Sequence, residues 1–147
     1  MIDNFVAKFT SKEIMYEKIG DSYYLIDKAI TNINFPYPLV FKGLCLGELR
    51  KDKFYPSLAL LDVLAKFSNE KVYVKDIGEM DFVYGKNLRK RHIVKVEGST
   101  KKGFLKLIMN MKNECLGYGK VVNDFSSEGV VIRNVLDKGD YLRREID

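Results

Sequence analysis

The residue types that usually carry catalysis are sparse in this chain of 147 residues. His92 is the single histidine, so no pair of histidines can hold a metal ion or relay a proton. Ser99 and Lys102 have the spacing of an SxxK motif, but its companion motifs are missing. Gly119-Lys120 lacks the upstream glycines of a phosphate-binding loop. We therefore expect no catalytic residue, no cofactor and no metal, and we predict that the protein is not an enzyme.

Cysteine usage and apolar runs indicate the compartment. Cys45 and Cys115 lie far apart and form no CxxC motif, so we expect two reduced, partly buried thiols. The longest apolar runs, about six to eight residues, are too short to cross a bilayer. No charged start followed by an apolar block resembles a signal peptide. These features predict a cytoplasmic protein without a membrane partner, and we expect a monomer.

The chemistry that the sequence favours is electrostatic. The formal net charge is +5, and residues 1–70 contribute none of it, because they hold nine Lys or Arg and nine Asp or Glu. From Lys86 to Lys112, nine basic residues face one acidic residue, Glu97. Such an imbalance opposes folding through self-repulsion, and Lys and Arg are the usual phosphate contacts. The pattern favours a polyanionic partner, although a solvated, solubilising face would have the same composition.

The stretch from Asn87 to Lys102 combines this charge with a strand pattern. Alternation sends Ile93 toward a core and Lys95 toward solvent. His92 lies among the cations, where it suits a contact with RNA. The predicted phosphate contacts of this stretch are Arg89, Lys90, Arg91, Lys95, Lys101 and Lys102. Among polyanions, a single-stranded nucleic acid would also stack its bases on flat side chains; the candidates are Tyr84, Tyr118 and Tyr141, two of which we expect to be core residues.

The first half, residues 1–70, has the pattern of a small α+β unit. Thr10 and Glu13 have capping-box spacing, which predicts a helix as far as Ile19. Asp27 is expected to cap a second short helix, and Pro36 and Pro38 cannot continue it. The remaining predicted elements are a helix at 28–33, strands at 22–26 and 39–49, a polar turn at 50–53 and a leucine-rich helix at 57–67.

The second half, residues 71–147, predicts a compact barrel-like β unit. Lys71–Lys75 alternates as a half-buried strand does. Ile77-Gly78 is predicted to turn the chain before a short helical segment, residues 79–88. Further strands are expected at 93–96, 104–109, 115–122 and 129–134. The predicted boundary between the two domains lies near residue 70.

Motifs in both halves resemble a known family. Phe82-Val83-Tyr84-Gly85-Lys86-Asn87, Leu116-Gly117-Tyr118-Gly119-Lys120 and Gly139-Asp140-Tyr141-Leu142-Arg143-Arg144 resemble, in order, a PUA domain, the RNA-binding module named after pseudouridine synthases and archaeosine transglycosylases. Leu44-Cys45-Leu46-Gly47, residues 60–65 and residues 71–75 resemble the NIP-seven family of large-ribosomal-subunit biogenesis proteins. The resemblance covers residues 27–144, and the short stretch before Asp27 looks like an archaeal form.

This resemblance implies an α+β protein in which a small N-terminal α/β pre-PUA domain, residues 1–70, packs against a PUA-type β-barrel, residues 71–147. It implies non-catalytic binding of single-stranded pre-rRNA during large-subunit assembly, with ribosome-assembly proteins docking on the N-terminal domain. The motifs point to Lys86, beside the Gly85 corner, and to Arg143 and Arg144 in a C-terminal strand. The alternative is an accessory RNA-binding subunit of an RNA-modification or exosome-type degradation complex.

Overall fold

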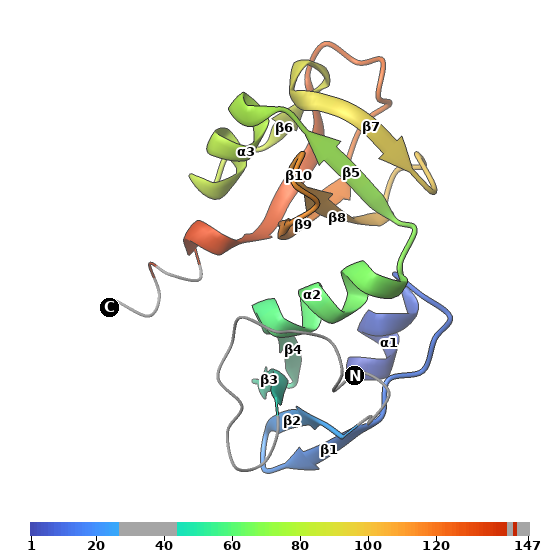
Figure 1. Ribbon diagram of the computed structural model, residues 1–147, viewed down its shortest axis with the longest axis vertical. Coiled ribbons are helices and arrows are strands. Elements are labelled where there is room, and N and C mark those ends of the chain that lie inside the picture. Colours follow the sequence, from blue (N-terminus) through green and yellow to red (C-terminus); the bar gives the residue numbers. More distant parts are fainter. Residues whose placement is uncertain (27–43, 141–142, 144–147) are drawn as a thin grey trace. The chain divides into compact units, whose positions relative to one another are not determined.

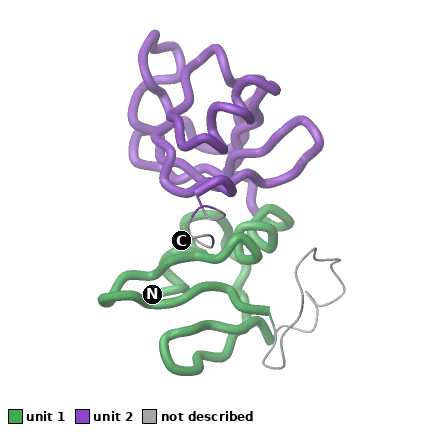
Figure 2. The backbone as a smooth tube through the Cα atoms, turned by 90° about the vertical axis from the view of Figure 1, so that its left-hand side faces the viewer, with its two compact units in different colours: residues 1–67 green, residues 68–147 purple. Residues whose placement is uncertain are grey.

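The computed structural model describes residues 1–26, 44–140 and 143. The chain divides into two compact units, Met1–Phe67 and Ser68–Asp147 (Figure 2). No helix in the described part of the chain is long and apolar enough to cross a membrane. Cys45 is half-buried and Cys115 is buried, and neither forms a disulfide.

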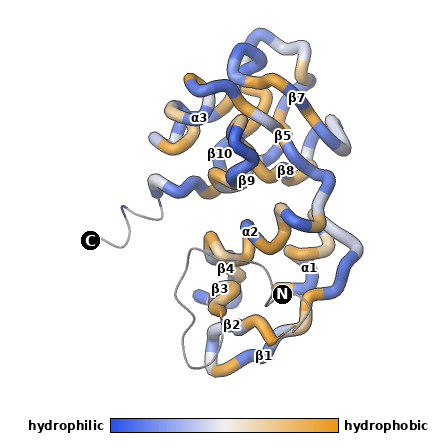
Figure 3. The backbone as a smooth tube through the Cα atoms, viewed as in Figure 1, coloured by the Kyte–Doolittle hydropathy of each residue, from blue (hydrophilic) through white to orange (hydrophobic). Residues whose placement is uncertain are grey.

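Within residues 1–26 and 44–67, the first unit combines two helices with an antiparallel sheet of four strands in the order β1-β2-β3-β4 (Figure 1). Lys51 and Asp52 have positive φ angles of 50° and 63°, which is the backbone of a tight hairpin turn and confirms the turn predicted at 50–53. The leucine-rich helix is also confirmed, and Figure 3 shows its hydrophobic stretches. The elements are α1 (Ile2–Ala7), β1 (Tyr16–Ile19), β2 (Ser22–Leu25), β3 (Leu44–Arg50), β4 (Lys53–Pro56) and α2 (Leu58–Phe67).

The helix predicted from Thr10 to Ile19 is wrong. Thr10 Oγ1 accepts a hydrogen bond from the Lys12 N–H at 3.1 Å, which forms a local turn instead of a helix cap. Strand β1 pairs with β2, and this hairpin places the Tyr16 ring 5.2 Å from the buried Tyr23 ring. Gly20, at φ +62°, makes the hairpin turn. Burial of the hairpin aromatics outweighs the local helix signal. The helix predicted at 28–33 lies outside the described residues.

The second unit contains a six-stranded sheet in the order β6-β10-β9-β8-β5-β7. Its two edge strands, β6 and β7, are separated in sequence by only the three residues of η1, so the sheet must curl until its edges approach each other (Figure 1). The predicted barrel-like architecture is confirmed. The elements are β5 (Lys71–Val74), α3 (Asp76–Val83), β6 (Leu88–Arg89), η1 (Lys90–His92), β7 (Ile93–Glu97), β8 (Leu105–Met109), β9 (Cys115–Val121) and β10 (Val130–Asp137).

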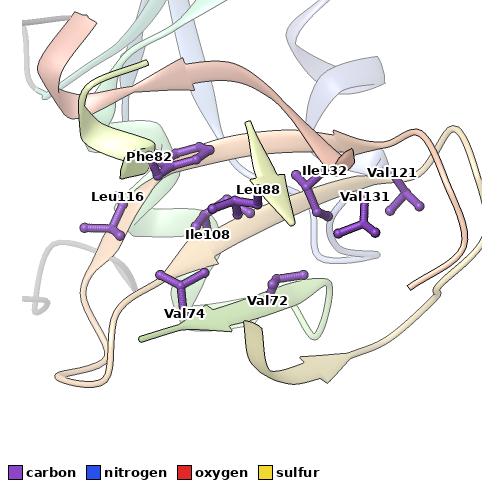
Figure 4. Close-up of a cluster of buried hydrophobic side chains, with 9 residues drawn as sticks. All are labelled: Val72, Val74, Phe82, Leu88, Ile108, Leu116, Val121, Val131 and Ile132. Carbon is purple, nitrogen blue, oxygen red and sulfur yellow. The ribbon is translucent and has the colours of Figure 1, made fainter. Parts of the chain in front are cut away.

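The core of this unit joins the sheet to helix α3. Phe82 of α3 is fully buried with apolar side chains of five strands; the cluster comprises Val72, Val74, Phe82, Leu88, Ile108, Leu116, Val121, Val131 and Ile132 (Figure 4). Gly78 belongs to this helix, so the turn predicted at Ile77-Gly78 is wrong. A Cβ at Gly78 would lie 2.9 Å from Val74 Cβ and 3.0 Å from His92 O. The missing side chain therefore allows α3 to pack closely, and it does not mark a turn.

Two glycines of β9, Gly117 and Gly119, allow close packing of this strand against β10. A Cβ at Gly117 would lie 2.0 Å from Leu136 O, and one at Gly119 would lie 2.5 Å from Ile132 Cγ2. Because β10 runs antiparallel beside β9, any side chain at these positions would push the two strands apart.

Candidate nucleic-acid interface

Two of the predicted RNA contacts, Lys86 and Arg143, lie at the C-terminal end of helix α3. Lys86 follows the helix; its side chain is 68% exposed, and its Nζ lies 3.8 Å from Asp81 Oδ1. Arg143 comes from the C-terminal segment of the chain, and its side chain reaches the same end of the helix. Its Nη1 donates to Val83 O at 3.4 Å, and its Nη2 lies 3.7 Å from Asp137 Oδ1. The fold thereby brings together two cations that are distant in sequence.

The backbone around Arg143 differs from the prediction. Residues 138–140 and Arg143 are helical, so the C-terminal strand predicted for Arg143 is wrong. Gly139 allows this segment to lie against the end of α3, because a Cβ there would be 1.8 Å from Val83 O. The side chain of Arg143 remains exposed. Arg144 lies outside the described residues.

Gly85 makes the sharp corner between α3 and Lys86. Its φ is +88°, and its N–H donates to Phe82 O at 3.0 Å, which is the usual glycine termination of a helix. A Cβ at Gly85 would make ordinary van der Waals contacts with the Arg143 guanidinium at 3.6 Å and with Asp137 Oδ2 at 4.0 Å. The Arg143 guanidinium therefore lies against this corner, which directly precedes Lys86 in the chain.

A second group of cations surrounds the junction of β6 and η1. Arg89, Lys90 and Arg91 are exposed, and Arg89 Nη1 donates to Glu128 O at 3.5 Å. His92 is 2% exposed, so the prediction that its side chain suits a contact with RNA is wrong. Its ring points inward, where Nδ1 accepts the Arg89 backbone N–H at 2.9 Å.

The third group follows β7 away from this junction. Lys95 projects from the strand with its Nζ 5.4 Å from the Tyr73 ring centroid and 3.7 Å from Glu97 Oε1. Lys101 and Lys102 are exposed in the loop after β7. A five-residue strand spans roughly 16 Å. The structure therefore places Lys101 and Lys102 away from the end of α3. The predicted cations are spread along the length of β7.

One cation of the Lys86–Lys112 segment is unavailable to a ligand. Lys106 is 0% exposed, and its Nζ donates to Glu70 Oε2 at 2.7 Å, to Ser99 O at 3.0 Å and to Glu97 O. The Glu70 carboxylate also accepts the Ser99 N–H at 3.1 Å. This ion pair, in which Lys106 is fully buried and Glu70 is partly exposed, fixes the start of the loop that carries Lys101 and Lys102.

The aromatic candidates separate by exposure. Tyr84 is 70% exposed beside the Gly85 corner, whereas Tyr118 is only 9% exposed. Burial raises the pKa of Tyr118 to about 12. Tyr141 lies outside the described residues. Phe104, which is 42% exposed and follows Lys101-Lys102-Gly103, is an aromatic that sequence reasoning missed; its position beside two lysines was the available signal.

Comparison with known proteins gives this surface its context. Residues 70–146 match the family described as the UPF0113 PUA domain. The chain is 32% identical over 133 residues to the 60S ribosome subunit biogenesis protein NIP7 of Saccharomyces cerevisiae, covering 84% of this chain and 73% of that protein. It is 30% identical over 114 residues to the nip7 protein of Schizosaccharomyces pombe, covering 73% of this chain and 63% of that protein.

Solved structures show the same fold. A conserved PUA domain protein from Thermoplasma acidophilum matches with a TM-score of 0.60 and 19% identity, covering 99% of this chain and 92% of that one. A PUA domain structure from Aeropyrum pernix K1 matches with a TM-score of 0.53 and 22% identity, covering 62% and 55%. The predicted α+β class with a PUA-type barrel is thereby confirmed.

Proposed function

Because the chain belongs to the NIP7 family of 60S ribosome subunit biogenesis proteins and carries a UPF0113 PUA domain, we propose that it binds single-stranded regions of pre-rRNA during large-subunit assembly, without catalysis. We assign RNA binding to the PUA domain, residues 71–147, and protein docking to the pre-PUA domain, residues 1–70. Its two yeast relatives are both named for a role in 60S subunit biogenesis.

The observation that carries this proposal is the set of exposed cations at the end of α3. Lys86 follows the Gly85 corner and the Arg143 guanidinium lies against it, and Arg89, Lys90 and Arg91 lie on the turn that follows. Their ion pairs are loose, at 3.7 Å for Arg143 and 3.8 Å for Lys86, so phosphate oxygens can compete for both groups. Residues 71–147 hold the whole formal excess of +5, which attracts RNA from a distance.

Tyr84 gives the same corner a surface for base stacking. Exposure of a tyrosine ring next to two cations is the combination that sequence-tolerant single-strand binders use, because each base stacks while its phosphate is neutralised. We propose that a base stacks on Tyr84 while the adjoining phosphates contact Lys86 and Arg143. Phe104 beside Lys101 and Lys102 is a weaker candidate of the same kind, since less of its ring is exposed.

The role of residues 1–70 rests on charge and on exposed apolar side chains. This half is formally neutral, so it offers RNA no net attraction. Phe54 packs against both Phe5 and Tyr23, and the ring centroids are 5.6 Å apart in each of these two pairs. Met15 and Ile26 are exposed, at 59% and 45%. A neutral surface with exposed apolar side chains suits a ribosome-assembly protein better than RNA.

Fluorescence anisotropy with labelled RNA tests the RNA-binding proposal. We expect the full chain to bind U-rich, A-rich and mixed single strands more tightly than a perfect duplex, with affinity falling as salt rises. Tyr84→Ala should weaken binding by about 1–3 kcal/mol, the range for one stacked base. Tyr24→Ala, which changes a half-buried tyrosine in the first unit, is the matched control. Absence of binding to every single strand at low salt would refute the proposal.

The cellular arm of the proposal needs a separate measurement. Ultraviolet crosslinking in the native organism, followed by sequencing of the bound RNA, should recover large-subunit rRNA precursors. Recovery of modification-guide RNAs or of messenger RNA fragments undergoing decay would instead favour the alternative of an accessory subunit in a modification or degradation complex.

A further inference from the structure

A buried pair, Asp81 and His92, lies beneath the two groups of cations at the end of α3. His92 Nε2 is 2.9 Å from Asp81 Oδ2, and the two side chains are only 2% and 18% exposed. The other carboxylate oxygen of Asp81, Oδ1, lies 3.8 Å from Lys86 Nζ. One carboxylate therefore contacts both the residue that holds the Arg89–Arg91 turn and the lysine at the glycine corner.

The hydrogen bonds fix the tautomer of His92. The Arg89 N–H donates to Nδ1 at 2.9 Å, so Nδ1 must lack a proton. Nε2 then carries the hydrogen and donates to Asp81. Both ring nitrogens are committed to the protein, which leaves neither available to RNA. The backbone around the ring is held as well, because His92 O accepts the Lys75 N–H at 2.9 Å.

The turn that presents the cations has few hydrogen bonds of its own. Strand β6 has two residues and η1 has three. A single 3₁₀ turn has poor hydrogen-bond geometry and is marginal without outside support. The bond from Arg89 N–H to His92 spans this turn from its first residue to its last. The direction in which Arg89, Lys90 and Arg91 project therefore depends on the position of the imidazole.

We propose that His92, whose ring Asp81 orients, is a positioning residue for RNA binding, which holds the Arg89–Arg91 turn in the direction in which one RNA strand can meet both the turn and Lys86. The inference rests on the proposed function. Its physical basis is preorganisation: side chains already held in the bound arrangement lose less conformational entropy when the ligand arrives. A free turn would have to be ordered by the RNA, at the expense of affinity.

Two substitutions of the same residue separate this role from simple structural support. His92→Asn keeps an acceptor near the position of Nδ1 for the Arg89 N–H but is too short to reach Asp81. His92→Gln keeps a donor near the position of Nε2 for Asp81 but loses the acceptor for Arg89. Both variants remove a buried ring and should lose similar stability. Only His92→Gln should release the turn that carries the arginines.

The experiment uses the full chain, a fluorescein-labelled U-rich RNA of twelve nucleotides and a series of salt concentrations, at a temperature where circular dichroism shows every variant folded. We expect His92→Gln to weaken binding about tenfold and to flatten the slope of log affinity against log salt by about 0.7–1.4, which corresponds to one or two lost phosphate contacts. His92→Asn should stay within about threefold of the wild type. Ile108→Val, a mild core substitution, controls for lost stability.

Hydrogen exchange of the Arg89 amide in isotopically labelled protein supplies a readout that a general loss of stability would not change selectively. The amide should stay protected in His92→Asn, which keeps an acceptor, and lose protection in His92→Gln, which does not. Equal affinity and slope for a folded His92→Gln and the wild type would overturn the inference, as would losses in both variants that simply follow their melting temperatures. A wild-type chain that binds no single-stranded RNA overturns the proposed function itself, and the inference with it.

Discussion

Replacing Arg89, Lys90, Arg91 and Lys95 together by Gln should flatten the salt dependence of RNA binding by about 2 in the slope of log affinity against log salt. In η1, successive side chains point about 120° apart, and His92 takes the inward direction. Because the outward side chains diverge, one strand of RNA can meet about two of the three residues in the 89–91 turn. Lys95 adds one contact, and three contacts at about −0.7 each give about −2.

The same variant should keep its stability within about 4 °C of the wild-type melting temperature. Lys95 loses an exposed ion pair at 3.7 Å and a cation–π contact at 5.4 Å, each a fraction of a kcal/mol. Relief of repulsion among neighbouring cations offsets part of that loss. A change in binding can therefore be attributed to lost contacts and not to unfolding.

The assay is anisotropy of labelled RNA at four or more salt concentrations, with U-rich, A-rich and mixed strands compared. The loss of affinity should be similar for all three, because phosphate contacts position a strand without reading its bases. A control variant removes the same number of positive charges from the first unit, at the exposed Lys8, Lys18, Lys53 and Lys66. A wild-type slope in the fourfold variant would show that the cluster is only a solvated face, and a loss confined to one RNA would show that it reads bases.

Three further predictions concern the C-terminal cations, the buried ion pair and the buried tyrosine. Replacing Arg143 and Arg144 by Ala should weaken RNA binding by roughly 1–3 kcal/mol in the same assay, the range for lost charge-assisted contacts, and unchanged affinity would move the site away from the C-terminus. Glu70→Gln should lower the free energy of unfolding, measured in urea, by about 3–5 kcal/mol, because the fully buried Lys106 ammonium loses its carboxylate partner. Lys106→Met should lower it by less, since Glu70 is partly exposed and can be hydrated. A larger loss of stability in Lys106→Met than in Glu70→Gln would contradict this. Burial raises the pKa of Tyr118 from its ordinary value of about 10 to about 12. This tyrosine should therefore leave stability unchanged below about pH 10 and lower it by up to about 3 kcal/mol as the pH rises to 12, and a Tyr118→Phe variant that shows the same fall would refute this assignment.

Local pattern was sufficient for much of the fold. Strict alternation located β5, because a half-buried strand presents every second side chain to the core. The pattern of Ile93–Val96 located β7, although its burial does not alternate, since Val94 and Lys95 are both exposed. The leucine spacing located α2, and the polar residues 50–53 located a hairpin turn, because each signal is read within a few residues. The errors arose where packing decides. Residues 16–25 form a hairpin in place of the helix that the capping-box spacing at Thr10 predicted. Gly78 lies within helix α3, where its missing side chain allows close packing against β5, although glycine usually marks a turn.

The candidate site follows the same division. The sequence by itself determined the charge, its position after residue 70 and the resemblance that family membership confirmed, since these depend only on which residues are present and in what order. It could not determine which cations reach solvent. Lys95 and Lys106 look equivalent in a strand pattern, yet one projects outward and the other is buried on Glu70. Only the tertiary structure decided this, because burial of a charge depends on a partner supplied from elsewhere in the chain. For the same reason only the fold placed Arg143 beside Lys86 and turned His92 inward onto Asp81.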